Sequence, residues 1–226
     1  MHYRRVIAQQ AVHGFGGGAV DRLRQGRAHE VRQLAVVTVD RWFFQIEGHE
    51  EAEKAVAALD PASPTAHLLT VRLAYSRLLF QRGPRTDDRA VAEAGYRAVV
   101  ESGDEKQRAW AEYHWAVLLD NIDEDPTGAL PLYETALAVA TKYGDGYFES
   151  YIIRHLAPHK EPAERISMLR RSLHLRAALG ARPQTIAAQA LLADNLPEGD
   201  PERAELMRTF RPGAEELQIG WLLHED

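Results

Sequence analysis

The chain has 226 residues, a formal net charge of −6 and no cysteine. This length is enough for one sizeable domain or two small ones. The acidic balance disfavours non-specific binding to nucleic acid, because proteins that bind it usually carry a basic excess that displaces counterions from the phosphates. The lack of cysteine excludes disulfides, zinc–thiolate sites and cysteine nucleophiles.

The chain shows no sign of a membrane segment. It contains no run of eighteen apolar residues, so we expect no membrane-spanning helix. Its charged start is followed by Gln9, Gln10 and His13, which interrupt the apolar stretch that a signal peptide needs. These features together predict a cytoplasmic protein.

Apolar residues recur at helical spacing along almost the whole chain, and alanine, the best helix former, is abundant. Glycine and proline fall between the periodic segments and mark their ends. Asp125-Pro126 and Asp200-Pro201 each have the pattern of an N-cap followed by proline at the first helical position. The predicted helices cover residues 19–47, 49–59, 64–82, 86–102, 104–121, 126–142, 146–157, 162–179, 183–195 and 201–209.

Residues 129–137 carry the clearest packing pattern. Small residues stand at Ala129 and Ala136, with Tyr133 between them, so a helix with this spacing can approach a neighbour closely while one ring fills the gap. Related positions recur, because Tyr96 lies 37 residues before Tyr133 and Leu169 lies 36 residues after it. Short loops between such helices favour antiparallel neighbours, and this period is typical of helical-hairpin repeats.

These residues resemble a known repeat. Ala129-Leu130-x-x-Tyr133-x-x-Ala136-Leu137 resembles the second helix of a tetratricopeptide repeat (TPR), and Trp115-Ala116 with Leu119 resembles the end of the first helix of that repeat. Residues 169–180 are similar to repeats found in bacterial regulators. The resemblance is best over residues 110–180.

The resemblance implies an all-α fold of stacked antiparallel helical hairpins in a TPR-like right-handed superhelical arc. Residues 86–226 would form the repeats, and residues 1–85 would form an N-terminal helical region or cap of the same continuous domain. Terminal repeats of such arrays are usually atypical because they cap the stack.

The resemblance also implies a binding groove, because the first helices of stacked hairpins line the concave side. Aromatic and arginine side chains dominate binding hot spots, and several fall at the groove positions. The alternative is that these rings belong to the core. The groove positions are Trp110, Tyr113, Val117 and Asp120, with Asn121 nearby, and then Tyr147, Ser150 and Arg154.

A second candidate surface is basic. No acidic residue occurs from Arg165 to Ala193, and this stretch includes Arg170, Arg171 and Arg176. A guanidinium group offers two parallel donors to a carboxylate or phosphate, so we include Arg170 and Arg171 among the candidate partner-binding residues. The alternative is a solvated face that balances the acidic turn at residues 120–125 through weak surface pairs.

Two motifs suggest metal sites. Asp123, Asp125, Thr127 and Glu134 follow the spacing of a calcium-binding loop, but a helix cap at Asp125 explains the same residues. His155 and His159 have the i, i+4 spacing of a metal-binding pair, but Pro158 lies between them, so we expect His155 on a helix surface and His159 in a loop.

The glycines at residues 14–18, followed by the β-branched run of residues 34–40, imitate a dinucleotide-binding unit. No further strand–helix–strand pattern follows, and the run also has helical spacing. We therefore expect residues 34–40 to be helical and residues 14–18 to form a loop.

No linear catalytic motif is present, and no cofactor is predicted. The leading hypothesis is a non-catalytic scaffold that binds a peptide or protein partner in its concave groove, as an adaptor or regulator. The alternative is an all-α enzyme or small-molecule sensor with a pocket between the hairpins. A closed, deep pocket with buried titratable groups would favour this alternative, whereas an open arc with exposed rings would favour the scaffold. A homodimer formed through the same rings is a third hypothesis.

Overall fold

The computed structural model describes residues 19–223, with side chains from residue 26 onwards. Within this part the chain is helical and contains no β-strand, so the predicted all-α class is confirmed. The glycine-rich residues 14–18 lie outside the described residues. The helices are α2 (Ala19–Gln45), α3 (His49–Ala57), α4 (Pro64–Phe80), α5 (Asp88–Ser102), α6 (Glu105–Asn121), α7 (Pro126–Lys142), α8 (Gly146–Leu156), α9 (Pro162–Ala178), α10 (Arg182–Asn195), α11 (Pro201–Leu217) and α12 (Gly220–Leu223), with a 3₁₀ turn, η2, at Ala157–His159.

The predicted helix boundaries agree closely with the structure except at the C-terminal end of the chain. The sequence predicts that the last helix ends at residue 209, but α11 continues through Pro212 to Leu217. Phe210 and Ala214 are buried against α10 on either side of Pro212. A Cβ at Gly213 would lie only 2.7 Å from Ile186 Cδ1, so α11 and α10 approach closely here. This packing outweighs the hydrogen bond that proline removes.

Residues 34–40 lie inside α2, as predicted, so the strand alternative is wrong. Ala35 and Val39 are buried, whereas Leu34 is 58% exposed and does not belong to the buried stripe.

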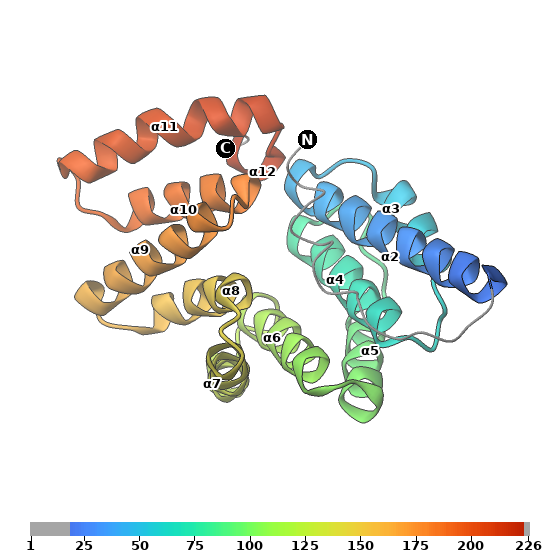
Figure 1. Cartoon of the computed structure of the whole chain (residues 1–226). Helices are drawn as coiled ribbons and strands as arrows, with labels where there is room; N and C mark the ends of the chain where they lie inside the picture. The colour runs from blue at the N-terminus through green and yellow to red at the C-terminus, as the bar shows by residue number, and fades with distance from the viewer. Residues whose placement is uncertain (1–18, 224–226) are drawn as a thin grey trace.

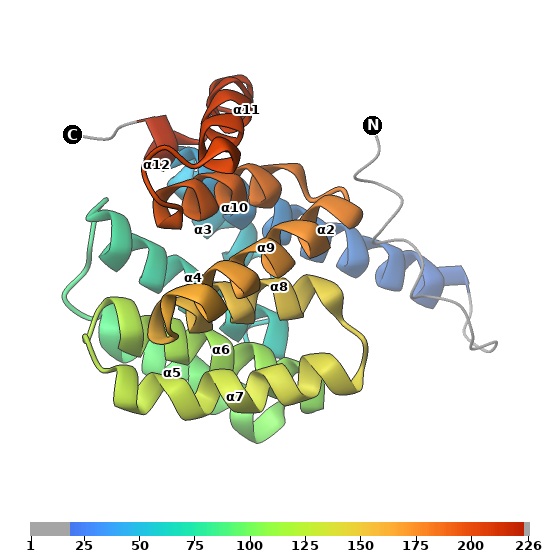
Figure 2. The same ribbon diagram turned by 90° about the vertical axis from the view of Figure 1, so that its left-hand side faces the viewer.

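Consecutive helices pack as hairpins in two layers (Figure 1). The pairs are α2/α3, α4/α5, α6/α7, α8/α9 and α10/α11. The first helices also contact one another, from α2 to α4, α4 to α6 and α6 to α8, so they form the inner layer. Figure 2 shows the outer helices α7 and α9 on the side turned towards the viewer.

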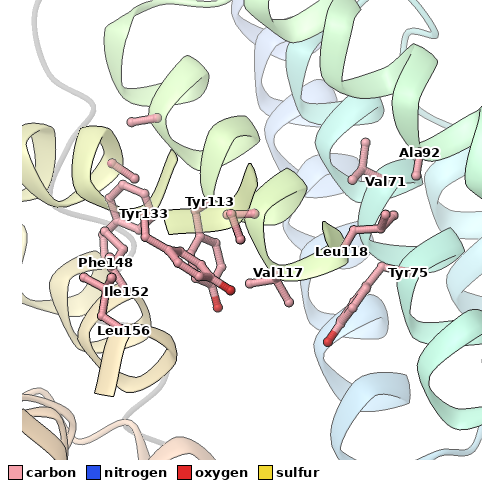
Figure 3. Close-up of a cluster of buried hydrophobic side chains, with 14 of the residues drawn as sticks. Val71, Tyr75, Ala92, Tyr113, Val117, Leu118, Tyr133, Phe148, Ile152 and Leu156 are labelled. Carbon is pink, nitrogen blue, oxygen red and sulfur yellow. The ribbon is translucent and has the colours of Figure 1, made fainter. Parts of the chain in front are cut away.

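The small residues of the repeat motif lie where α7 meets its neighbours. Ala129, Tyr133 and Ala136 are all fully buried, as is Ala116 on the facing helix α6. Figure 3 shows the Tyr133 ring beside that of Tyr113, close to the apolar side chains of α8. The predicted packing of this motif is therefore confirmed.

The turns after α7 and α9 support the 36-residue period. Gly144 and Gly180 both adopt positive φ, 62° and 68°, which costs glycine little. The backbone hydrogen bonds around them are the same: Asp145 N donates to Ala140 O, and Ala181 N donates to Arg176 O. The structure is thus an array of repeated helical hairpins over this region.

The two ends of the array meet. Gln45 Nε2, at the end of α2, donates to Leu217 O at 3.2 Å, and Phe44 packs in the same cluster as Ile219. A Cβ at Gly220 would lie 2.9 Å from Gln45 O, so α12 lies directly against α2. The hairpins therefore follow a path that curves back on itself (Figure 1).

The first two hairpins are joined by a buried ion-pair network. Arg77 on α4 donates through Nε to both carboxylate oxygens of Asp88 on α5, at 2.9 and 3.1 Å, and through one terminal nitrogen to Glu53 on α3, at 2.8 Å. The side chain of Asp88 is fully buried, and its carboxylate also accepts from Arg85 N. Removing one partner from such a network leaves an uncompensated charge in the interior.

We predict that Asp88→Ala lowers the free energy of unfolding by about 3 kcal/mol, measured by urea denaturation. Asp123→Ala is the matched control, because Asp123 pairs with Arg89 on the surface, and we expect a change below about 1 kcal/mol. Equal effects of the two substitutions would show that the network does not stabilise the fold.

Candidate functional site

The inner layer, together with parts of α9, α10 and α12, lines a cavity of about 710 Å³ that is partly open to solvent. Two of its lining residues are exposed, namely Asn121 at the C-terminal end of α6 and Pro158 in η2. The wall is formed by Val36, Asp40, Phe43, Phe44, Thr65, Leu68, Leu69, Arg72, Tyr75, Leu79, Phe80, Trp110, Tyr113, His114, Val117, Asn121, Tyr147, Tyr151, Arg154, His155, Pro158, Arg176, Gln184, Ala187, Leu191 and Trp221.

The lining residues follow the helical period, which explains why one face of each first helix points inwards. On α6 the lining residues include Trp110, Tyr113, Val117 and Asn121, spaced by three or four residues. On α8 they show the same spacing, from Tyr147 through Tyr151 to Arg154 and His155. The opposite faces pack on the second helices through small and aliphatic residues.

Aromatic rings hold one wall in place. Trp110 stacks on Phe148 with ring centroids 4.0 Å apart, and Tyr113 meets Tyr151 and His155 edge to face. Only 4% of Tyr113 is exposed, so this ring belongs both to the core and to the cavity wall (Figure 3). Because each ring is fixed by its neighbours, the wall is formed before any ligand binds.

One of the three arginines in the wall is balanced by a carboxylate. Arg72 on α4 forms an ion pair with Asp40 on α2, and both side chains are largely buried. Burial lowers the pKa of Arg72, but Asp40, together with Tyr151 and Tyr147, outweighs this and raises that pKa overall. This pair contributes no net charge to the cavity.

The other two arginines have no carboxylate partner among residues 26–223, where side chains are described. Arg176 is 2% exposed and donates to Ser150 Oγ, Ser150 O and Gln184 O, and it lies over the Tyr151 ring at 4.7 Å. Among the described side chains, Arg154 is hydrogen-bonded to His155 Nε2, at 3.3 Å, through one terminal nitrogen. The wall therefore carries two unbalanced positive charges.

Both histidines of the wall are held neutral. Burial, together with the smaller effect of the Arg72 charge, lowers the pKa of His114 to about 3. Burial also lowers the pKa of His155 well below its usual value, with added repulsion from Arg154 and Arg176. Near neutral pH the positive charge of the cavity is therefore that of its arginines.

Besides Asp40 Oδ1, which lies in the ion pair with Arg72, three buried polar atoms of the wall lack a hydrogen-bond partner in the described part of the chain. They are Arg154 Nε, Gln184 Oε1 and Trp221 Nε1. The neighbouring hydroxyl groups are better satisfied, since Gln184 Nε2 donates to Tyr147 Oη and Asn121 Nδ2 donates to Tyr75 Oη. Buried polar groups are nearly always paired in folded proteins, so the three atoms are candidates for contact with a bound molecule.

The structure brings together five of the eight residues that the sequence predicts for partner binding: Trp110, Tyr113, Asn121, Tyr147 and Arg154. Asp120 lies behind the wall, where its carboxylate contacts Tyr133 Oη at 3.3 Å and His159 Nε2 at 3.1 Å. Ser150 is also behind the wall and accepts from Arg176.

Arg170 and Arg171 lie on the outer helix α9 and do not reach the cavity. Arg170 pairs with Glu202 on α11, and Arg171 pairs with Glu149 on α8. These two arginines of the basic stretch are thus balanced by acids from neighbouring helices and not by the acidic turn, where Asp123 pairs with Arg89.

The motifs with metal-site spacing take structural roles. Asp125 caps α7 by accepting from Gly128 N at 2.9 Å, as its position before Pro126 predicts. Within residues 19–223 no three acidic or histidine side chains gather as a metal cluster. The prediction that His155 lies on a helix surface is wrong, because its ring lines the cavity between Tyr113 and Tyr133.

Several wall residues are absent from the sequence-based prediction. Arg72 and Asp40 come from the first 85 residues, where the repeat resemblance is faint, and Trp221 comes from a helix that was not predicted. Arg176 stands on a second helix, whose side chains the repeat pattern assigns to the outer layer. The repeat pattern places a small residue at the position of Arg176, so an arginine there is the sequence signal that marks this position as unusual.

We predict that stability falls as the pH drops from 7 to 5. The unfolded chain takes up a proton at His114 below its ordinary pKa of 6.5, whereas the folded protein does not until pH is near 3. Through His114 alone, the free energy of unfolding should therefore be about 2 kcal/mol lower at pH 5 than at pH 7. His114→Gln should remove this share of the pH dependence in urea denaturation, and an identical pH dependence in the variant would contradict the neutral, buried histidine.

Comparison with known proteins does not assign the chain to a family. No family model, no curated protein and no solved structure matches the chain. None of the helices within residues 19–223 has both the length and the apolar character that a bilayer crossing requires. The case for function therefore depends on the cavity itself.

Proposed function

We propose that this protein is a TPR-like, non-catalytic receptor that binds one small, largely apolar organic molecule in its central cavity. The observation that carries the proposal is a preformed cavity of about 710 Å³ in which fixed aromatic rings surround a few polar groups. Small-molecule sites are typically about 300–1,000 Å³, mostly apolar, and lined by a small number of oriented polar side chains. The buried histidines and arginines match the features that favour the sensor alternative.

The contact between α12 and α2 supports a small occupant over a partner helix. A helix with its side chains is about 10–12 Å across, so a cavity of this volume would hold only about one and a half turns. Binding a longer segment would require the contact between Gln45 and Leu217 to open. The hypothesis of a peptide or protein partner in an open groove stays a prediction, as does a homodimer.

The neutral fluorescent probe N-phenyl-1-naphthylamine tests the proposal, because it is aromatic, uncharged and small enough for the cavity. We predict saturable binding of one probe per chain, with a rise in probe fluorescence. The double variant Leu68→Trp/Leu191→Trp fills space from two sides of the wall and should weaken binding at least about tenfold.

The matched control is Leu34→Trp/Leu179→Trp, which places the same side chains at positions that are 58% and 41% exposed. This control should bind the probe like the unmodified protein. The melting temperatures of both variants show whether they fold. Non-saturable binding, or equal loss in the cavity and control variants, would refute the proposed receptor function.

A further inference from the structure

We infer that the ligand of this cavity is an apolar organic acid whose carboxylate is bound by Arg154 and Arg176. This inference rests on the proposed function and specifies its ligand class. It starts from the charge of the wall: three arginines face one aspartate, and that aspartate is already paired with Arg72. A bound monoanion would offset part of the remaining charge without disturbing the pair.

Arg176 is held in a fixed position by the protein. Three of its five N–H groups are bound to Ser150 and Gln184, at 3.0–3.3 Å, and its guanidinium plane lies over the Tyr151 ring. The residue lines the cavity and is only 2% exposed, and its other two N–H groups make no hydrogen bond to the described side chains or backbone. A rigid guanidinium with free donors is well suited to a carboxylate, because it loses little freedom on binding.

Arg154 supplies the second cation. Its Nε is buried without a partner, and only one terminal nitrogen is engaged, with His155. The two arginines are close enough to affect each other: burial is the main cause that lowers the pKa of Arg176 to about 10, Tyr151 opposes this shift, and the charge of Arg154 contributes to it. An anion between the two groups would relieve this repulsion and pair the orphan N–H.

The histidine and tyrosine side chains that face this region are uncharged, so an anion would pair with the two arginines. His114 and His155 are neutral, and the buried hydroxyl groups of Tyr75 and Tyr113 are protonated, since burial raises the pKa of Tyr75 to about 12 and that of Tyr113 further still. Tyrosine hydroxyl groups can donate to a carboxylate but cannot replace a cation.

A carboxylate fits this site better than a phosphate. A phosphate monoester carries about −1.5 to −2 charges near neutral pH, and its transfer from water to an aromatic cavity costs more than that of a singly charged group. The aromatic wall favours an apolar body attached to a compact anionic head. These considerations select an aromatic or similarly apolar monocarboxylate.

The test uses displacement of N-phenyl-1-naphthylamine by 2-naphthoate, by its neutral isostere 2-naphthamide and by 2-naphthyl phosphate. We expect 2-naphthoate to displace the probe at a concentration at least about tenfold lower than 2-naphthamide. Equal displacement by acid and amide would overturn the inference while the receptor function stands, and so would a preference for 2-naphthyl phosphate. Failure of the probe itself to bind would overturn the proposed function and the inference with it.

Variants assign the selectivity to the two arginines. Arg154→Gln should reduce the preference for acid over amide about tenfold, because it removes one of the two cations that bind the carboxylate, and its Nε makes no hydrogen bond within the described residues that the substitution would break. Arg176→Gln should act likewise, but it also removes bonds to Ser150 and Gln184, so Arg154→Gln carries the test if Arg176→Gln does not fold.

Arg171→Gln is the matched control, since Arg171 pairs with Glu149 outside the cavity. An unchanged preference in Arg154→Gln, or equal loss in Arg171→Gln, would contradict the inference.

Discussion

The close approach of consecutive helices through small side chains is the constraint on which the rest of this structure depends. Ala116 on α6 and Ala129 and Ala136 on α7 are fully buried, so these backbones lie near each other and leave no space for a large residue on the shared face. The large rings of the first helices are consequently placed on their other face, which is the interior of the curved array. Packing between hairpins and formation of the cavity are therefore two consequences of one spacing of residues.

The charge distribution follows from the same two-layer arrangement. The chain is acidic overall, yet its interior cavity is positive, because outer arginines such as Arg170 meet carboxylates on neighbouring helices whereas Arg154 and Arg176 face inwards, away from them. A buried cation without a counterion costs stability, and here that cost falls at the wall of a cavity. Departures of this kind from the usual pairing of buried charges are most often found at functional sites.

Most of the fold could be predicted from the sequence because helical period, N-caps and breakers are local signals. Asp125-Pro126 begins a helix for reasons contained in those residues, and the spacing of Tyr133 between two alanines predicts its burial. The wall of the cavity was harder to predict. Trp110 and Tyr147 follow from the repeat pattern, but Arg72 lies on a helix where that pattern is faint, and Trp221 reaches the cavity because the ends of the array meet, a closure that no local pattern encodes. His155 was assigned to the surface because Pro158 ends its helix, whereas the side chain is covered by rings from α6 and α7.

A crystal structure determined in the presence of 2-naphthoate tests the central claim most directly. The account predicts the naphthalene ring inside the cavity, against Trp110 and Tyr147, with its carboxylate within hydrogen-bond distance of Arg154 and Arg176. An interior filled by the protein's own side chains, or the acid bound only on the outer layer beside Arg170 or Arg171, would contradict it.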